Sequence, residues 1–187
     1  GPGAVRKDLF IAEIEIALGI AAPCHPDAQV TIRHSGLTIS ARTDAVGLLA
    51  LDIPAFEHPA FVSVELPDGT LGDALLPLPD LAGYDRVALV GTGPGLELHA
   101  MEGDAAWSSP GHLHPGATRS AEDASDGLGY LSTLGTEGGI VQVYTMPRTG
   151  PVAEAGVRFS VDAPVTTATC TRQAEAGLLR MEGGGRV

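Results

Sequence analysis

The stretch 28–69 alternates apolar and polar residues in four short segments, and this period of two constrains the fold more than any other feature. Turn-forming residues separate the segments at 35–36, 44–47, 54–59 and 67–69. A period of two buries one face of a strand and leaves the other face in water. The stretch therefore predicts strands of a small antiparallel sheet.

The same pattern predicts strands in the rest of the chain. The first is expected at 9–18, and later ones at 86–90, 96–100, 140–146, 156–161, 166–171 and 177–181, with 86–90 and 96–100 paired as a hairpin. The 25 glycines and 14 prolines form a turn-rich composition. We therefore predict an all-β protein that forms an antiparallel β-sandwich.

The organisation of the chain follows from changes in composition. Residues 1–8 are interpreted as the remnant of a cleaved expression tag, Gly1-Pro2-Gly3, followed by a linker. Residues 9–187 are predicted to form the sandwich, divisible into sub-modules 9–83 and 84–187. The segment 102–139 has little periodicity and is too long for an ordinary connection, so we expect an irregular functional loop with a short helix at 120–124.

Charge and hydropathy exclude two classes of partner. The formal net charge of −12 argues against nucleic acid, because phosphate contacts need clustered Lys and Arg. No apolar run approaches the roughly 20 residues of a membrane span, so no transmembrane segment is expected in this sequence. The apolar content of 44% is that of a folded chain.

The two cysteines, Cys24 and Cys170, lie outside any zinc-binding spacing. One interpretation is a disulfide bond formed in an oxidising compartment, and the other is a pair of buried free thiols in a cytosolic protein. We predict the disulfide. Closing so long a loop would contribute about 4 kcal/mol in the chain-entropy treatment.

Part of the chain resembles a known family. A strand that ends in Thr-Asp, followed by x-x-Gly and an aliphatic strand closed by proline, is typical of transthyretin-like, carboxypeptidase-regulatory β-sandwich domains. The matching residues are Val30, Ile32, Gly36, Thr43, Asp44, Gly47, Leu49, Leu51, Ile53 and Pro54. In such a turn the Asp44 carboxylate should accept backbone amides while Gly47 takes a positive φ. The resemblance implies a transthyretin-like β-sandwich of the wider immunoglobulin-like group, and it implies no particular activity.

The whole chain is also similar to uncharacterised envelope proteins of alphaproteobacteria that carry the label "translocase". The matching stretches are VTIRHSG (30–36), YDRVAL (84–89), LELHA (96–100) and VYTMP (143–147). This resemblance implies a bacterial protein that is exported to the periplasm or the exterior. It also implies association with the membrane through an N-terminal segment that has been removed.

The histidines of the motif GHLHPG (111–116) carry the sharpest chemical signal. On an extended chain His112 and His114 point the same way and can coordinate one metal ion, with His99, Glu102 or Asp104 as a third ligand. The alternative is a pair of solvated turn residues. We expect no cofactor, so the metal site stays the minor alternative.

Other chemistries lack their required patterns. The run RVALVGTGPG (86–95) imitates a dinucleotide fingerprint, but Leu96 occupies the third glycine position and no helix is expected after it. Neither G-x-S-x-G nor S-x-x-K occurs, and the acidic cluster 122–126 lacks the spacing of an EF-hand. The sequence therefore predicts a protein that is not an enzyme.

The only tryptophan, Trp107, lies in the long loop, where it either anchors a protein interface or pins the loop to the sandwich. We hypothesise a structural or protein-binding module of an envelope assembly that uses Trp107, His112, His114 and Tyr130 as its contact surface. Two alternatives remain open: a metal-dependent or carbohydrate-directed enzyme or binder that uses the same loop, and a homo-oligomer subunit that pairs through exposed sheet edges.

Overall fold

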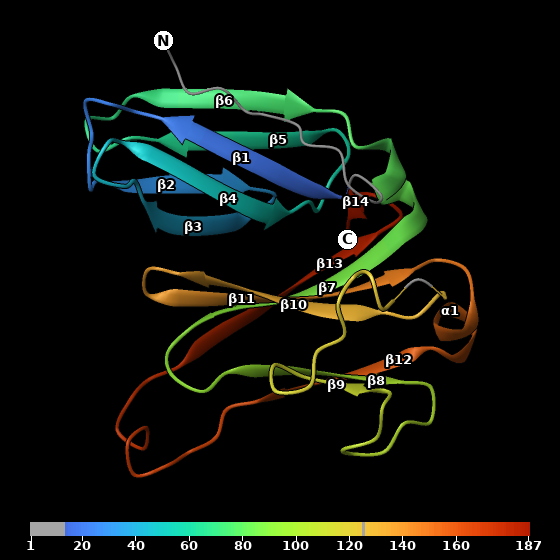
Figure 1. Cartoon of the computed structure of the whole chain (residues 1–187). Helices are drawn as coiled ribbons and strands as arrows, with labels where there is room; N and C mark the ends of the chain where they lie inside the picture. Colours follow the sequence, from blue (N-terminus) through green and yellow to red (C-terminus); the bar gives the residue numbers. More distant parts are fainter. Residues whose placement is uncertain (1–13, 125) are drawn as a thin grey trace. The chain divides into compact units, whose positions relative to one another are not determined.

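The computed structural model describes residues 14–124 and 126–187, which fold as antiparallel β-sandwich structure (Figure 1). The described residues divide into two compact units. Unit 1 comprises 14–82 and 184–186, and unit 2 comprises 83–124, 126–183 and 187. Within these residues, no helix is both long and apolar enough to cross a bilayer.

Unit 1 consists of a two-stranded and a four-stranded antiparallel sheet that lie face to face (Figure 1). The first pairs β1 (Glu15–Ala21) with β4 (Leu48–Pro54). The second has the order β3-β2-β5-β6, with β2 (Gln29–His34), β3 (Leu37–Arg42), β5 (Ala60–Glu65) and β6 (Leu71–Leu76). The alternating residues are buried as the period of two predicts: Ile16, Leu18 and Ile20 on β1, and Val30 and Ile32 on β2. The predicted first strand is thus shifted to Glu15–Ala21, and residues 9–13 lie outside the described residues.

The turn after β3 has the predicted chemistry. Asp44 Oδ1 accepts the backbone N–H groups of Val46 at 2.9 Å and Leu48 at 2.8 Å, and Gly47 has a φ of 81°. A Cβ atom on Gly47 would lie 2.2 Å from the carbonyl oxygen of Ala22. Glycine is therefore required both by the backbone angle and by the close approach of a second segment.

Unit 2 contains two further antiparallel sheets. One has the consecutive order β10-β11-β7-β13, with β7 (Tyr84–Thr92), β10 (Tyr130–Thr136), β11 (Gly139–Pro147) and β13 (Glu175–Glu182). The other has the order β12-β8-β9, with β8 (Glu97–Glu102), β9 (His112–Leu113) and β12 (Val157–Asp162). The short elements are η1 (Pro79–Gly83), α1 (Pro151–Ala155) and β14 (Gly185–Arg186), of which η1 and β14 lie wholly or mainly in unit 1.

The core of unit 2 lies between its two sheets. Its buried members are Leu89, Leu96, Leu98, Ala100, Leu113, Leu131 and Tyr144. Gln142 joins the sheets through hydrogen bonds: its Oε1 accepts the Leu98 N–H at 2.6 Å, and its Nε2 donates to the Leu96 carbonyl at 2.8 Å. The oxygen and the nitrogen of this buried amide thus each have a backbone partner at the start of β8.

Four predictions about local structure are wrong. The segments 86–90 and 96–100 are strands but not a hairpin, because β7 and β8 belong to different sheets. Residues 166–171 form turns instead of a strand, since Thr169 Oγ1 accepts the Thr166 N–H at 2.7 Å and Cys170 N–H bonds the Thr166 carbonyl at 2.8 Å. Residues 120–124 form a turn instead of a helix, although Ser120 Oγ accepts the Asp123 N–H as a cap would. The segment 102–139 is also not wholly irregular, because it contains β9 and β10.

The predicted disulfide bond is absent. Cys24 and Cys170 are both exposed free thiols, and they belong to different units. Cys170 lies in the turn described above, with Sγ 3.6 Å from the Thr167 carbonyl. The argument from an oxidising compartment therefore loses its support.

Candidate functional site

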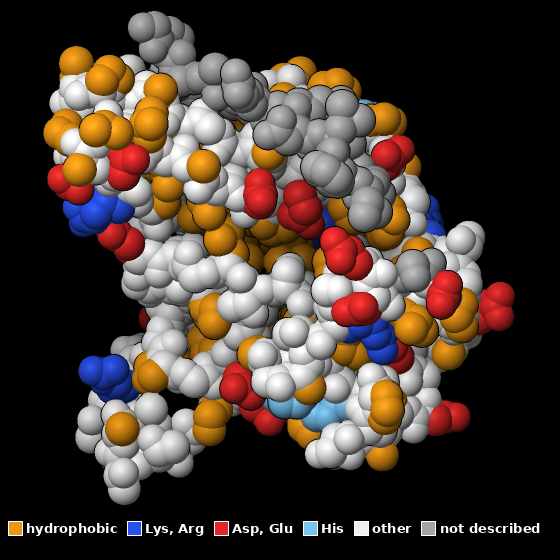
Figure 2. All heavy atoms as spheres, in the orientation of Figure 1, with side chains coloured by type: hydrophobic (Ala, Val, Ile, Leu, Met, Phe, Trp, Pro, Cys, Tyr) orange, Lys and Arg blue, Asp and Glu red, His pale blue; other side chains and the backbone are white. Residues whose placement is uncertain are grey.

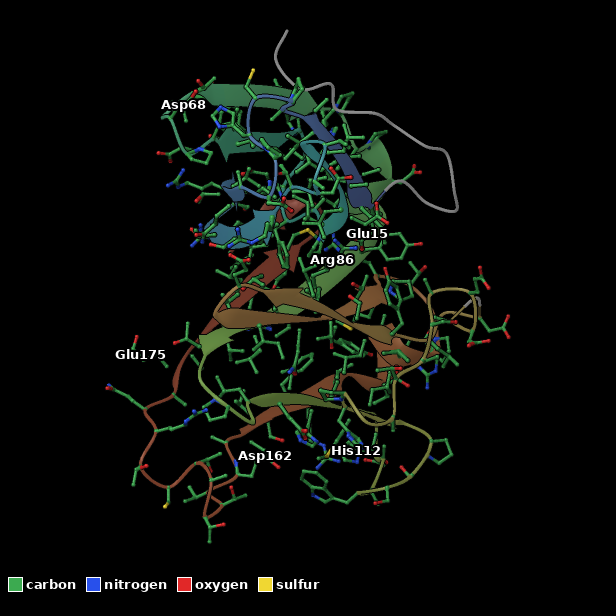
Figure 3. All side chains as sticks on the ribbon, turned by 60° about the vertical axis from the view of Figure 1, so that its left-hand side comes forward. Glu15, Asp68, Arg86, His112, Asp162 and Glu175 are labelled. Atoms are coloured by element: carbon green, nitrogen blue, oxygen red, sulfur yellow. The ribbon has the colours of Figure 1, made fainter. Side chains whose placement is uncertain are left out.

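The outer face of the β12-β8-β9 sheet carries a cluster of histidine and carboxylate side chains. Leu98 and Ala100 of β8 point into the core, so Glu97 and His99 point outward. The strand register places Asp162 opposite Glu97, Ser160 opposite His99 and His112 opposite Met101. Figure 3 shows His112 and Asp162 on the side of this sheet that faces away from the other sheet of unit 2.

Three histidine rings stack on this face. The ring centroids of His112 and His114 lie 4.8 Å apart, which confirms that both side chains point the same way. His99 lies 5.1 Å from His112 and 5.3 Å from His114. Trp107 lies in the loop between β8 and β9. Its ring centroid is 5.0 Å from that of His99 and 4.4 Å from that of His112, which it meets edge-on. We call these four residues the Trp107 platform.

Trp107 remains open to solvent although it is held in place. Its exposed fraction is 57%, whereas His99 and His112 are buried. The backbone N–H of Ser108 donates to His112 Nδ1 at 3.0 Å. This bond secures Ser108 at a φ of 65°, a conformation that costs a residue with a side chain about 1–2 kcal/mol. His112 thus fixes both the backbone beside Trp107 and the Trp107 ring.

The hydrogen bonds determine which ring nitrogens carry protons. Because His112 Nδ1 accepts the Ser108 N–H, the proton of a neutral His112 must be on Nε2. This N–H donates to His99 Nδ1 at 2.8 Å, which in turn places the proton of His99 on Nε2. A second proton on either ring would break one of these two bonds, so the arrangement requires both imidazoles to be neutral.

The pKa of His112 reflects the same constraint. Burial lowers the pKa of the His112 imidazole below its ordinary value, and the neighbouring His114 and His99 lower it further. Asp162 acts in the opposite direction. His112 is therefore a neutral hydrogen-bonding residue at physiological pH.

Two carboxylates flank the far end of this chain of bonds. His99 Nε2 lies 3.4 Å from Asp162 Oδ2 and 3.6 Å from Glu97 Oε2. This atom is buried, and among residues 14–124 and 126–187 it has no hydrogen-bond partner. The Glu97 and Asp162 side chains are 43% and 51% exposed. The face therefore joins aromatic rings to two solvent-exposed carboxylates. Figure 2 shows acidic side chains next to histidine side chains on the molecular surface.

The geometry does not support the metal hypothesis. Both ring nitrogens of His112 are already used in hydrogen bonds, and His114 Nδ1 accepts the Gly116 N–H at 3.2 Å. In the described part of the chain, no group of three or more His, Cys, Asp or Glu residues is arranged to hold a metal ion. The two histidines and His99 come together as stacked rings.

Glu102, considered as a third ligand, has a different task. Its Oε1 accepts hydrogen bonds from the Tyr144 hydroxyl at 2.8 Å, the Gly129 N–H at 2.9 Å and Arg119 Nη1 at 2.8 Å. Glu102 thereby fixes the loop that follows β9 to the edge of the core. Asp104, the other carboxylate considered as a third ligand, is exposed to solvent.

Tyr130 does not join the predicted contact surface. It lies on β10, in the other sheet of unit 2, and its neighbour Leu131 points into the core. Tyr130 therefore projects from the opposite face of that sheet, away from the sheet that carries Trp107. Of the four predicted contact residues, the structure brings together Trp107, His112 and His114.

Sequence reasoning did not find the acidic part of the site. Glu97 and His99 alternate on β8, which places them on one face from sequence alone. Asp162 joins them only through the pairing of β12 with β8, across a long separation in the chain. Comparisons with protein-family models, curated proteins and solved structures find no match for this chain.

Proposed function

We propose that this protein is a non-enzymatic β-sandwich module that binds another protein in a bacterial envelope assembly, with the Trp107 platform as its contact surface. The observation that carries the proposal is a half-exposed tryptophan fixed by two histidine rings. Large aromatic side chains dominate the binding energy of protein interfaces.

The platform is already ordered without a partner. Ring contacts hold the Trp107 side chain, and the Ser108 bond to His112 holds its backbone. Arg158 Nη2 also donates to the Ala105 carbonyl at 3.0 Å, which ties the same loop to β12. Binding therefore loses little side-chain and loop entropy, a condition that favours affinity.

The envelope location rests on the resemblance of the stretches 30–36, 84–89, 96–100 and 143–147 to exported proteins. The strongly acidic composition favours solubility and is compatible with any aqueous compartment. We propose periplasmic or extracellular residence because of this resemblance to exported proteins.

The experiment is affinity capture from an envelope extract of the source cells, with Trp107→Ala and Phe61→Ala as matched variants. Phe61 is an aromatic residue of unit 1 with a similar exposed fraction, 49%. We expect the wild-type chain and Phe61→Ala to retain the same partner and Trp107→Ala to lose it. Retention of that partner by Trp107→Ala would refute the proposed surface.

A further inference from the structure

We infer that the Trp107 platform binds an arginine side chain of its partner, stacked on Trp107 and paired with the carboxylates of Asp162 and Glu97. The inference deepens the proposed function and rests on it. It specifies the chemistry of the partner's central contact residue.

The first argument is the negative charge beside the platform. Asp162 and Glu97 both approach the same imidazole, His99, whose hydrogen bonds require it to be neutral. Their negative charges are consequently not compensated by His99 or His112. Arg158 projects from the same face of β12, but one of its guanidinium nitrogens is already used in binding the Ala105 carbonyl.

The second argument is the incomplete hydrogen bonding at this point. The Nε2–H of His99 is buried and points between the two carboxylates without reaching hydrogen-bond geometry to either in the described residues. The carboxylate oxygens thus keep acceptor capacity on their solvent side. A donor that arrives from solvent can bond these oxygens, whereas the Nε2–H of His99 is itself a donor and stays unsatisfied.

The third argument is the combination of an aromatic face with carboxylates. Trp107, Asp162 and Glu97 all contact or approach His99, so one long side chain can reach the ring and a carboxylate together. A guanidinium group stacks on tryptophan and forks onto a carboxylate, whereas an ammonium group acts as a point charge without this fork. These features favour arginine over lysine.

The chain offers a direct readout, because Trp107 is its only tryptophan. The probes are three short peptides that differ at one central position: arginine, lysine or citrulline, the last being the uncharged analogue of arginine. We expect a saturable change in Trp107 fluorescence at low ionic strength with the arginine peptide, a weaker affinity for lysine and none for citrulline. Salt should weaken the arginine complex.

Matched variants separate the platform from general acidity. Asp162→Asn and Glu97→Gln should each weaken arginine-peptide binding at least threefold, whereas Glu175→Gln should leave it unchanged. Glu175 lies on β13, away from Asp162 (Figure 3). Equal affinity for the citrulline peptide, absence of any saturable response, or unchanged affinity in both the Asp162→Asn and the Glu97→Gln variant would overturn the inference.

The two proposals fail differently. If Trp107→Ala loses the captured partner but the arginine peptide does not bind, the contact surface stands and the arginine inference is wrong. If the arginine peptide binds but Trp107→Ala still captures the partner, the platform binds arginine and the proposed function is wrong.

Discussion

The hydrogen bond from Tyr144 to Glu102 offers a quantitative test of how the long loop is anchored. The Tyr144 side chain is buried, and its hydroxyl donates to Glu102 Oε1 at 2.8 Å. Burial, followed by the nearby Glu102 charge, raises the pKa of the Tyr144 hydroxyl well above its usual range. The hydroxyl therefore stays protonated and remains a donor throughout the neutral range.

Tyr144→Phe removes one hydrogen bond to a charged acceptor, which is typically worth about 1.5–3 kcal/mol. Glu102 keeps the Gly129 N–H and Arg119 as donors, so its carboxylate is not left unpaired. We therefore expect a loss near the lower limit, about 1.5–2 kcal/mol. Glu102→Ala leaves Arg119, whose side chain is only 16% exposed, without its carboxylate, and should cost about 3 kcal/mol or more.

The assay is urea unfolding followed by the fluorescence of Trp107, which reports on unit 2. Thr145→Val is the matched control, because the Thr145 hydroxyl is buried without a hydrogen-bond partner among the described residues. We expect no loss from it. A loss below about 0.5 kcal/mol in Tyr144→Phe, or full additivity with Glu102→Ala in a double-mutant cycle, would refute the reasoning.

Three further predictions concern pH, backbone strain and thiols. Burial and the neighbouring histidines lower the pKa of His112 in the folded state, so the unfolded chain binds more protons as the pH falls. The free energy of unfolding of unit 2 should therefore decrease below about pH 6.5. In urea titrations at several pH values, His112→Gln should reduce this dependence of stability on pH. Gly47→Ala should lower the free energy of unfolding by more than about 2 kcal/mol, measured by circular dichroism, because it adds a backbone clash to the cost of a positive φ. Gly69→Ala is the control, with a φ of 83° and open space around the added Cβ, and should cost about 1 kcal/mol. Equal losses in the two variants would contradict the clash. Cys24 and Cys170 should both react with a thiol reagent in the native, unreduced protein, and a chain without titratable thiols would contradict the structure.

The fold class could be predicted because it depends on local chemistry. Alternation along β1 and β2 fixes which residues face the core, and Asp44 with Gly47 fixes the turn that follows β3. The alternation states which face is buried but not which strand is the neighbour. For this reason 86–90 and 96–100 were correctly predicted as strands and wrongly paired as a hairpin.

Propensity misled where local side chains compete with the sheet. Residues 166–171 are rich in β-branched threonine, yet Thr169 bonds the Thr166 backbone and closes a turn. The disulfide prediction failed for a different reason. The number and spacing of cysteines carry no information on the distance between them in the fold.

Residue identity and short spacing are enough to predict the period-two scaffold, the side-by-side orientation of His112 and His114, and the presence of a single tryptophan, Trp107. The meeting of Glu97, His99 and Asp162 with the two histidines depends on the folded arrangement of the strands. Their meeting requires β12 and β9 to flank β8 in one particular register, and strand register is set by packing between distant segments.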